Sequence, residues 1–346
     1  YGTLVSAGGG KPPRPEVGAE YVAGNSTFKN ADVEFRVTGR RFVIRYLAAQ
    51  QTDAMVWIDG RPIRSRPFTT PDFSDSGSLR WLTVALDSPR TVTVRFAGPA
   101  VFGGVETDPA EPTSLSAPPR RFTLGVVADS YYESTINEGW RSTAPAVELS
   151  TLTGFRIWNL AQGGTGYLND TTGAALRGDG GLPGHYATPY GSAQRIREIA
   201  RAPIDALLVN GSINDGPPFT RLQHRLAVKR FLDAVHRVRP ELPVVLVGVE
   251  PVAFWGAPDV PLKHFLDLEQ NLGCEMRTHA QVRAVVPSYR ENWLTGTGAI
   301  GHPRRDGNQD RFIGKDWIHP TTAGVLFYQR KVATALASVT MGRPPA

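Results

Sequence analysis

Cysteine is almost absent from this sequence, since Cys274 is the only one among 346 residues. A single thiol excludes an intrachain disulfide and a zinc site built from several cysteines. No set of histidine, aspartate and glutamate residues has the spacing of metal ligands, so we predict a metal-free mechanism without a cofactor. A chain of this length can bury enough apolar surface to fold without such cross-links.

Long apolar runs and blocks of like charge are also missing. No stretch approaches the roughly 20 apolar residues of a membrane-spanning helix, so we expect no membrane span. The formal net charge is +6, but the positive residues are spread along the chain and no nucleic-acid-binding motif accompanies them. We therefore expect no nucleic acid partner, and a mildly basic surface that favours an acidic polymer or the cell envelope.

The first third of the chain has the pattern of a β-sheet domain. Apolar and polar residues alternate over short stretches, and Asp59-Gly60 is a strong hairpin signal. The expected strands are Val33–Val37, Phe42–Leu47, Ala54–Ile58, Leu79–Leu86 and Thr91–Phe96. Short strands at this spacing, with almost no helical periodicity, predict a jelly-roll-like β-sandwich accessory domain over residues 1–105.

Residues 106–120 are rich in proline and serine, which predicts a linker. Beyond it, strands and helices alternate, and this predicts an α/β domain over residues 121–346 with a parallel sheet between two helical layers. The expected strands are Phe122–Val127, Phe155–Leu160, Ile204–Val209, Val244–Val249 and Ala284–Pro287. The expected helices are Ala193–Ala202, Thr220–Arg237, Leu262–Gln281 and Thr321–Val339.

Three of these predicted strands end in residues that suit catalysis. Ser130 follows the first strand, Gly163-Gly164 the second and Asn214 the third. The carboxyl ends of parallel strands meet at one edge of a sheet, where open α/β sheets hold their ligands. A serine hydroxyl there is a candidate nucleophile, glycines expose backbone N–H groups, and an asparagine amide can donate to an oxyanion.

The fourth motif, Asp316-x-x-His319, precedes the last predicted helix. Serine at its ordinary pKa is a weak nucleophile and needs an adjacent base. His319 is the best candidate, because it alone has a carboxylate at a fixed short spacing, able to fix its tautomer and stabilise its imidazolium. Taken singly, each motif has a simpler explanation: Ser130 or Asp129 as a helix cap, the glycines or Asn214 as turns, and Asp-x-x-His as chance.

Together, the order strand–serine, strand–glycine, strand–asparagine and then Asp-x-x-His before the last helix resembles the SGNH (GDSL) hydrolase superfamily. The resemblance covers roughly residues 122–340 and extends to motif spacing as well as residue type. It implies an SGNH-type three-layer α/β/α fold. It also implies that Ser130 is the nucleophile, His319 the general base and Asp316 the residue that orients the imidazole.

The same resemblance implies an oxyanion hole. Its donors would be the N–H of Ser130, the N–H of Gly164 and the side chain of Asn214, with Gly163 as the alternative if the register slips by one. One departure from the family pattern is Ala128, which stands where the family has the glycine of Gly-Asp-Ser. A methyl group there is a small change that can restrict the turn.

A second departure is a long glycine-rich insertion, about residues 169–192, which we expect to line the substrate cleft. Its candidate contact residues are His185, Tyr186 and Tyr190. Tyr131 follows the nucleophile and is expected to shape the acyl pocket. Trp255 follows the fourth strand and is expected to stack on a sugar or to pack in the core.

The resemblance implies a serine esterase that works through an acyl-enzyme. A β-sandwich ahead of such a domain is similar to carbohydrate esterases that remove acetyl groups from polysaccharides, so the expected substrate is an O-acetylated glycan or another small ester. The alternatives are a glycan O-acyltransferase, a lipase or lysophospholipase, and a non-catalytic glycan-binding or structural protein. We expect a secreted or cell-envelope location, since the lack of a signal pattern at the N-terminus says nothing against export.

Overall fold

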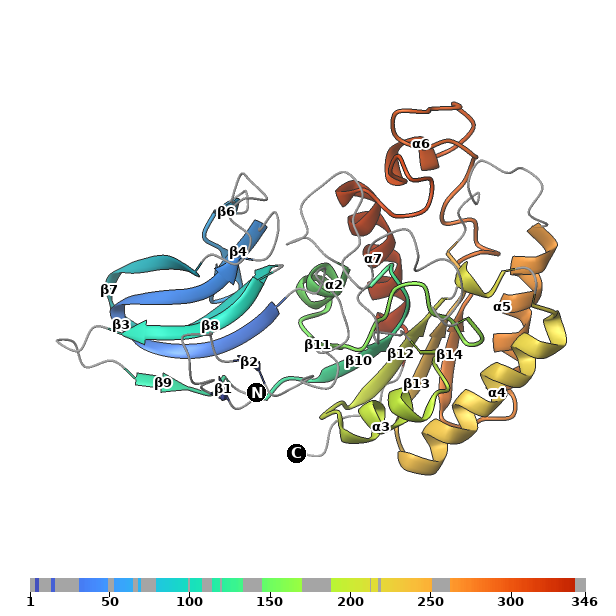
Figure 1. The fold of residues 1–346 in the computed structure, drawn as a ribbon, viewed down its shortest axis with the longest axis horizontal. Helices are drawn as coiled ribbons and strands as arrows, with labels where there is room; N and C mark the ends of the chain where they lie inside the picture. Colours follow the sequence, from blue (N-terminus) through green and yellow to red (C-terminus); the bar gives the residue numbers. More distant parts are fainter. Residues whose placement is uncertain are drawn as a thin grey trace. The chain divides into compact units, whose positions relative to one another are not determined.

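The computed structural model describes fourteen stretches of the chain (Figure 1). These are residues 4–5, 14–15, 31–48, 53–64, 68–69, 79–98, 100–107, 114–118, 120–132, 145–169, 188–211, 213–216, 219–250 and 262–339. The chain forms two compact units, and the main division falls between Arg120 and Arg121. Among the helices in these stretches, none is both long and apolar enough to cross a membrane.

The first unit is an antiparallel sheet in the order β5-β4-β7-β3-β8, with β6 paired to β4 and β9 paired to β3. A separate pair is formed by β1 and β2. The bounds are β1 Leu4–Val5, β2 Arg14–Pro15, β3 Ala31–Ala48, β4 Asp53–Ile58, β5 Arg61–Pro62, β6 Phe68–Thr69, β7 Leu79–Gly98, β8 Ala100–Thr107 and β9 Ser114–Ser116.

Two strands, β3 and β7, are much longer than the sequence pattern predicts, because each joins two of the expected short strands. Their register shifts between Gly39 and Arg41. The buried residues Phe35 and Val37 are odd-numbered before the shift, whereas the buried Phe42 after it is even-numbered. The Phe35 and Phe42 rings lie edge to face, 6.2 Å apart. Gly39 pairs with Arg90 and Arg41 pairs with Ala85, so the pairing is irregular at this point. The alternation reverses across the irregularity, and both halves of β3 face one core.

The segment predicted as a linker is partly strand. Strand β8 continues to Thr107, and Ser114–Ser116 pairs with β3 opposite Arg36–Thr38. β8 pairs with β3 only along Phe42–Ala48, which leaves the edge at Arg36–Thr38 for another segment. An unpaired strand edge has backbone N–H and C=O groups without partners. Pairing with this edge makes Ser114–Ser116 a strand, although composition alone predicts a linker there.

The second unit contains a parallel sheet in the order β11-β10-β12-β13-β14. Its strands are β10 Thr123–Val127, β11 Arg156–Asn159, β12 Ala206–Asn210, β13 Val244–Val247 and β14 Val282–Val286. Its α-helices are α2 Pro145–Thr153, α3 Ala193–Arg201, α4 Arg221–Val238, α5 Leu262–Met276, α6 Gln309–Phe312 and α7 Thr322–Ala337, with a 3₁₀ turn, η4, at Ile213–Asp215. All strand pairs are parallel, which confirms the predicted α/β class.

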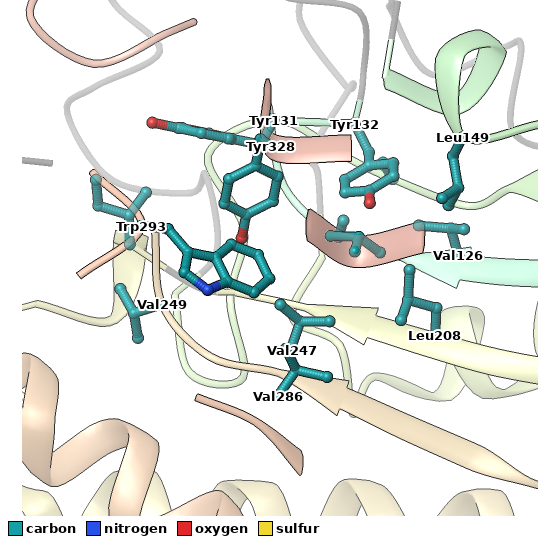
Figure 2. Packing of buried hydrophobic residues seen from close by; sticks show 14 of the residues in the cluster. Val126, Tyr131, Tyr132, Leu149, Leu208, Val247, Val249, Val286, Trp293 and Tyr328 are labelled. Atoms are coloured by element: carbon teal, nitrogen blue, oxygen red, sulfur yellow. The ribbon is translucent and has the colours of Figure 1, made fainter. Parts of the chain in front are cut away.

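Alternate strand residues face two separate cores. Val126 and Leu208 belong to the cluster that includes α2 and α7, whereas Val127 and Leu207 belong to the cluster that includes α3 and α4. Figure 2 shows the first cluster, where strand side chains lie beneath the rings of Tyr132, Tyr328 and Trp293. Because a central parallel sheet is buried on both faces, its strand ends are held rigidly, and these ends carry the candidate motifs.

The sequence pattern did not predict α2. Its nine residues include several serine and threonine side chains, which favour turns and helix caps over helix interiors. In the structure, the Thr151 hydroxyl donates to the carbonyl of Val147 over 2.9 Å, and that of Thr153 to the carbonyl of Leu149 over 2.7 Å. Packing against α7 thus stabilises a helix whose residues have no clear helical periodicity.

Substituting Phe231 tests the packing of the second core, the cluster that includes α3 and α4. Phe231 is fully buried on α4 and makes edge contacts with Tyr167 at 5.7 Å and Tyr190 at 6.4 Å. Phe231→Ala is expected to lower the free energy of unfolding by about 3–5 kcal/mol, because it leaves a cavity. Leu222→Ala on the same helix, where the side chain is 64% exposed, should change it by less than about 0.5 kcal/mol. Urea unfolding of both variants measures this, and equal midpoints would contradict the described packing.

Candidate active site

Ser130 lies on a tight turn directly after β10. The carbonyl of Asp129 accepts from the N–H of Tyr132 over 3.1 Å, and its side-chain Oδ1 accepts from the N–H of Tyr131 over 2.9 Å. Asp129 is fully buried, whereas Ser130 is half-buried. The carboxylate therefore shapes the turn from inside, and the serine is the residue that the turn presents at the sheet edge.

The loop ahead of α7 brings Asp316 and His319 together. Oδ1 of Asp316 accepts from the N–H groups of Ile318 and His319, over 3.1 and 3.0 Å. The N–H of Gly314 donates to the carbonyl of His319 over 2.9 Å, which closes the loop. Trp317 has φ 65°, a left-handed conformation that is uncommon for a bulky residue. This turn lets a carboxylate three residues earlier reach the imidazole.

Ser130, His319 and Asp316 form one hydrogen-bonded line. Nδ1 of His319 lies 2.6 Å from Oδ2 of Asp316, and Nε2 lies 2.8 Å from Oγ of Ser130. An ionised carboxylate can only accept, so the imidazole proton belongs on Nδ1. Nε2 is then an acceptor for the serine hydroxyl, which is the arrangement that general-base activation of a serine requires.

The other two predicted motifs lie at the same sheet edge. Nδ2 of Asn214, in η4, donates to the carbonyl of Thr165 over 3.0 Å and lies 3.3 Å from Oδ2 of Asp129. Gly164 adopts φ 71°, which glycine reaches without strain. Asn169 donates through its side-chain amide to the carbonyl of Gly164. The asparagine, the glycine turn and the serine turn are therefore joined by hydrogen bonds.

Two residues expected to contact substrate lie in the interior instead. Tyr131 is 2% exposed, and its hydroxyl donates to the carbonyl of Ile318 over 2.6 Å. Burial raises the pKa of Tyr131 well above its ordinary value, so the hydroxyl keeps its proton and remains a donor. Tyr190 is fully buried and donates to the carbonyl of Asn210 over 3.0 Å. Their rings pack against neighbouring aromatic residues, Tyr131 against Tyr328 and Tyr190 against Tyr167.

The remaining substrate contacts, His185, Tyr186 and Trp255, lie outside the residues that the structure describes, as does most of the glycine-rich insertion. Ala128, the departure from the family pattern, is fully buried. Its carbonyl accepts from the N–H of Gln162 over 2.9 Å. The methyl group belongs to the apolar cluster and thus fits the turn.

Sequence reasoning missed Glu250, a buried carboxylate close to the turn that carries Ser130. Its Oε1 accepts from the side-chain amide of Asn210. A Cβ on Gly211 would lie 3.2 Å from Oδ2 of Asp129 and 3.5 Å from Oε2 of Glu250, so both carboxylates flank this glycine. Burial, and then the charge of Asp129, raise the pKa of Glu250 well above its usual range. An acidic residue directly after an apolar strand was the available signal.

Arg195, on α3, was missed as well. Its guanidinium is 1% exposed and donates to the carbonyl of Leu160 and, over 3.4 Å, to the carbonyl of Ala128. These carbonyls lie just beyond β11 and β10, so the arginine joins the ends of the two strands that lead to the glycine and serine motifs. Nothing in the sequence distinguishes this arginine from the others on α3.

The comparisons with known proteins find likeness in structure alone. No family model and no curated protein matches the chain. A carbohydrate esterase family 2 enzyme plus carbohydrate binding domain from Corynascus thermopiles (Myceliophthora fergusii) matches with TM-score 0.60 and 16% identity, covering 91% of this chain and 96% of that one.

Two further solved structures carry other chemistries on the same fold. A salicylyl-acyltransferase from a tetracycline biosynthetic pathway matches with TM-score 0.60 and 12% identity, over 97% of this chain and 93% of that chain. A GDSL-like lipase from Bacteroides ovatus matches with TM-score 0.58 and 10% identity, over 94% of this chain and 90% of that chain. These likenesses confirm the predicted fold.

Tyr131→Phe tests whether the hydroxyl supports the histidine loop. Losing one buried hydrogen bond costs about 0.5–1.5 kcal/mol, so we expect a fluorophosphonate to label Ser130 roughly two- to tenfold more slowly. Tyr132→Phe is the matched control, because that hydroxyl donates to Gln329 on α7 over 2.8 Å rather than to the histidine loop. Equal labelling rates for the two variants would show that the Tyr131 hydroxyl does not position His319.

Proposed function

We propose that this protein is a serine esterase that hydrolyses O-acyl esters, with O-acetyl groups on a carbohydrate as the expected substrate. The observation that carries the proposal is the line from Ser130 through His319 to Asp316, with contacts of 2.8 and 2.6 Å. Its position at the carboxyl edge of the parallel sheet is where such folds bind their ligands.

In the acylation step, Oγ of Ser130 attacks the ester carbonyl while its proton passes to Nε2 of His319. The imidazolium that forms is stabilised by the carboxylate of Asp316. The tetrahedral intermediate then collapses, the bond to the leaving alcohol breaks, and Nε2–H of His319 protonates that alcohol. The products of this step are the free sugar hydroxyl and an acyl-Ser130 ester.

In the deacylation step, a water molecule takes the place of the alcohol. His319 accepts its proton, the resulting hydroxide attacks the acyl carbonyl, and the second tetrahedral intermediate returns Ser130 to its hydroxyl form. The acid leaves, and the hydrogen-bonded line is restored. Because the same residues act in both steps, substituting Ser130, His319 or Asp316 is expected to slow acylation and deacylation alike.

We propose the N–H of Ser130, the N–H of Gly164 and the amide of Asn214 as the donors to the oxyanion. One hydrogen of the Asn214 amide is directed to the carbonyl of Thr165, at 3.0 Å. The other is within a long 3.3 Å contact with Asp129, which a developing oxyanion can replace. In enzymes that use such donors, losing one lowers kcat by about 10²–10³.

The carbohydrate substrate is supported by the arrangement of the chain. The structural neighbour from Corynascus thermopiles is named as a carbohydrate esterase with a carbohydrate binding domain, and the likeness spans both units. We propose that residues 1–105 form an accessory domain that helps to hold a polymer, and that residues 121–346 carry the catalysis. A net charge of +6 suits an acidic glycan or a cell-envelope location.

A second candidate function is acyl transfer to a glycan hydroxyl. The salicylyl-acyltransferase matches with the same TM-score, 0.60, as the carbohydrate esterase. Both reactions share the acyl-enzyme and differ only in the acceptor, which is water in one and an alcohol in the other. A lipase or lysophospholipase is the third candidate, and the GDSL-like lipase fold is compatible with it.

A substrate panel tests the function. We expect the full chain to release acetate from acetylated sugars faster than it cleaves phospholipids, and Ser130→Ala to lower kcat by at least about 10³. Adding unacetylated glycan separates the candidates, because an acyltransferase moves the acyl group to it whereas an esterase releases free acid. Hydrolysis that persists in Ser130→Ala, or no turnover of any ester, would overturn the proposal.

A further inference from the structure

We infer that Asp215 is a positioning residue that holds the glycine loop, residues 163–169, beside Asn214 and so keeps the oxyanion donors in place. This inference rests on the proposed function. Asp215 is fully buried in η4, directly after Asn214. The proposed mechanism assigns it no role.

The carboxylate of Asp215 accepts three consecutive backbone N–H groups from the glycine loop. Oδ2 accepts from Tyr167 over 2.7 Å, and Oδ1 accepts from Leu168 over 3.0 Å and from Asn169 over 2.9 Å. Bonds from N–H groups to an ionised carboxylate are shorter and stronger than neutral ones. One side chain therefore fixes the C-terminal half of the loop to the turn that carries Asn214.

Gly166 allows this close approach. A Cβ at this position would lie 2.3 Å from Oδ1 and 2.5 Å from Cγ of Asp215. Gly166 is not among the glycines with positive φ, so its backbone conformation is open to other residues. The absence of a side chain at Gly166 is thus explained by contact with the carboxylate.

Hydrogen bonds connect Asp215 to the residues that carry two of the three proposed donors, Gly164 and Asn214. Asn169, whose N–H binds Asp215, donates through its side chain to the carbonyl of Gly164. Thr165, the next residue in the loop, accepts from the amide of Asn214 over 3.0 Å. Removing the carboxylate would loosen the part of the loop that holds the carbonyl of Gly164 and, through Thr165, the Asn214 amide.

A second layer of polar residues supports Asp215 from α4 and α5. Nε2 of His224 lies 3.8 Å from Oδ2 of Asp215, and both side chains are at most 1% exposed. The amide of Asn271 donates to the carbonyl of Arg221 over 3.0 Å and lies 3.1 Å from Nδ1 of His224. Because this amide nitrogen is a donor, Nδ1 accepts, and the ring proton lies on Nε2 on the side of Asp215.

The experiment compares Asp215→Asn with wild type in the full chain. An amide side chain cannot accept three N–H groups as a carboxylate does, so hydrogen exchange of the Tyr167–Asn169 amides should accelerate at least about tenfold. The rate constant for labelling Ser130 with a fluorophosphonate should fall roughly 10- to 100-fold. In that reaction the Oγ–P bond forms, fluoride leaves, His319 takes the proton, and the phosphoryl oxygen occupies the oxyanion hole.

Two features separate positioning from simple loss of structure. Unfolding lowers the fraction of protein that is labelled, whereas a displaced loop lowers the rate constant of the folded fraction. The pH at which labelling reaches half its maximum rate should stay as in wild type, because His319 and Asp316 are unchanged. Gly166→Ala is the second variant, since its methyl group displaces the same carboxylate, and it should slow labelling in the same way.

Asp205→Asn is the matched control. Asp205 also accepts a backbone N–H, that of Thr123 over 2.8 Å, but at the opposite end of β10. The Asp205→Asn variant should leave unchanged both the hydrogen exchange of the Tyr167–Asn169 amides and the rate of fluorophosphonate labelling. Labelling of Asp215→Asn within twofold of wild type, or unchanged loop exchange, would overturn the inference. If wild type reacts with no ester and no fluorophosphonate, the proposed function fails, and the exchange data still decide whether Asp215 holds the loop.

Discussion

The hydrogen bond from Nδ1 of His319 to Asp316, over 2.6 Å, is the interaction on which the site depends. It fixes the imidazole proton on one nitrogen and leaves the other, 2.8 Å from Oγ of Ser130, as an acceptor. The bond exists because the loop folds Asp316 back onto two backbone N–H groups, with Trp317 in a left-handed conformation. The hydrogen bonds of Asp316 thus stabilise a turn in which Trp317 has an unfavourable backbone conformation.

A buried polar layer beneath the sheet edge holds the remaining parts. Asp129 shapes the turn that carries Ser130, Asp215 binds the glycine loop, and Arg195 joins the ends of β10 and β11. Each of these side chains is at most 1% exposed, and a buried charge needs hydrogen-bond partners such as those they have here. Such a layer is costly to bury and places backbone donors before a substrate arrives, which is what oxyanion stabilisation requires.

Much of this architecture could be predicted from the sequence, and the reasons are local. Apolar strands bounded by turn residues marked the parallel sheet within a few residues of its observed bounds, and the rule that parallel strands share a carboxyl edge brought Ser130 beside Asn214. What could not be predicted depends on tertiary contacts. Helix α2 lacks periodicity and is stabilised by packing, β9 pairs with a free strand edge, and the role of Asp215 appears only when the glycine loop lies against it.

Nitrogen-15 NMR of the histidine rings can locate the ring proton of His319, because protonated and unprotonated ring nitrogens resonate far apart. The sequence contains seven histidines, and a His319→Gln variant identifies the signals of His319. We expect neutral His319 to carry its proton on Nδ1, the less common tautomer of a free imidazole, and we expect Asp316→Asn to remove this preference. A proton on Nε2, or a rapid mixture of both tautomers in wild type, would contradict it.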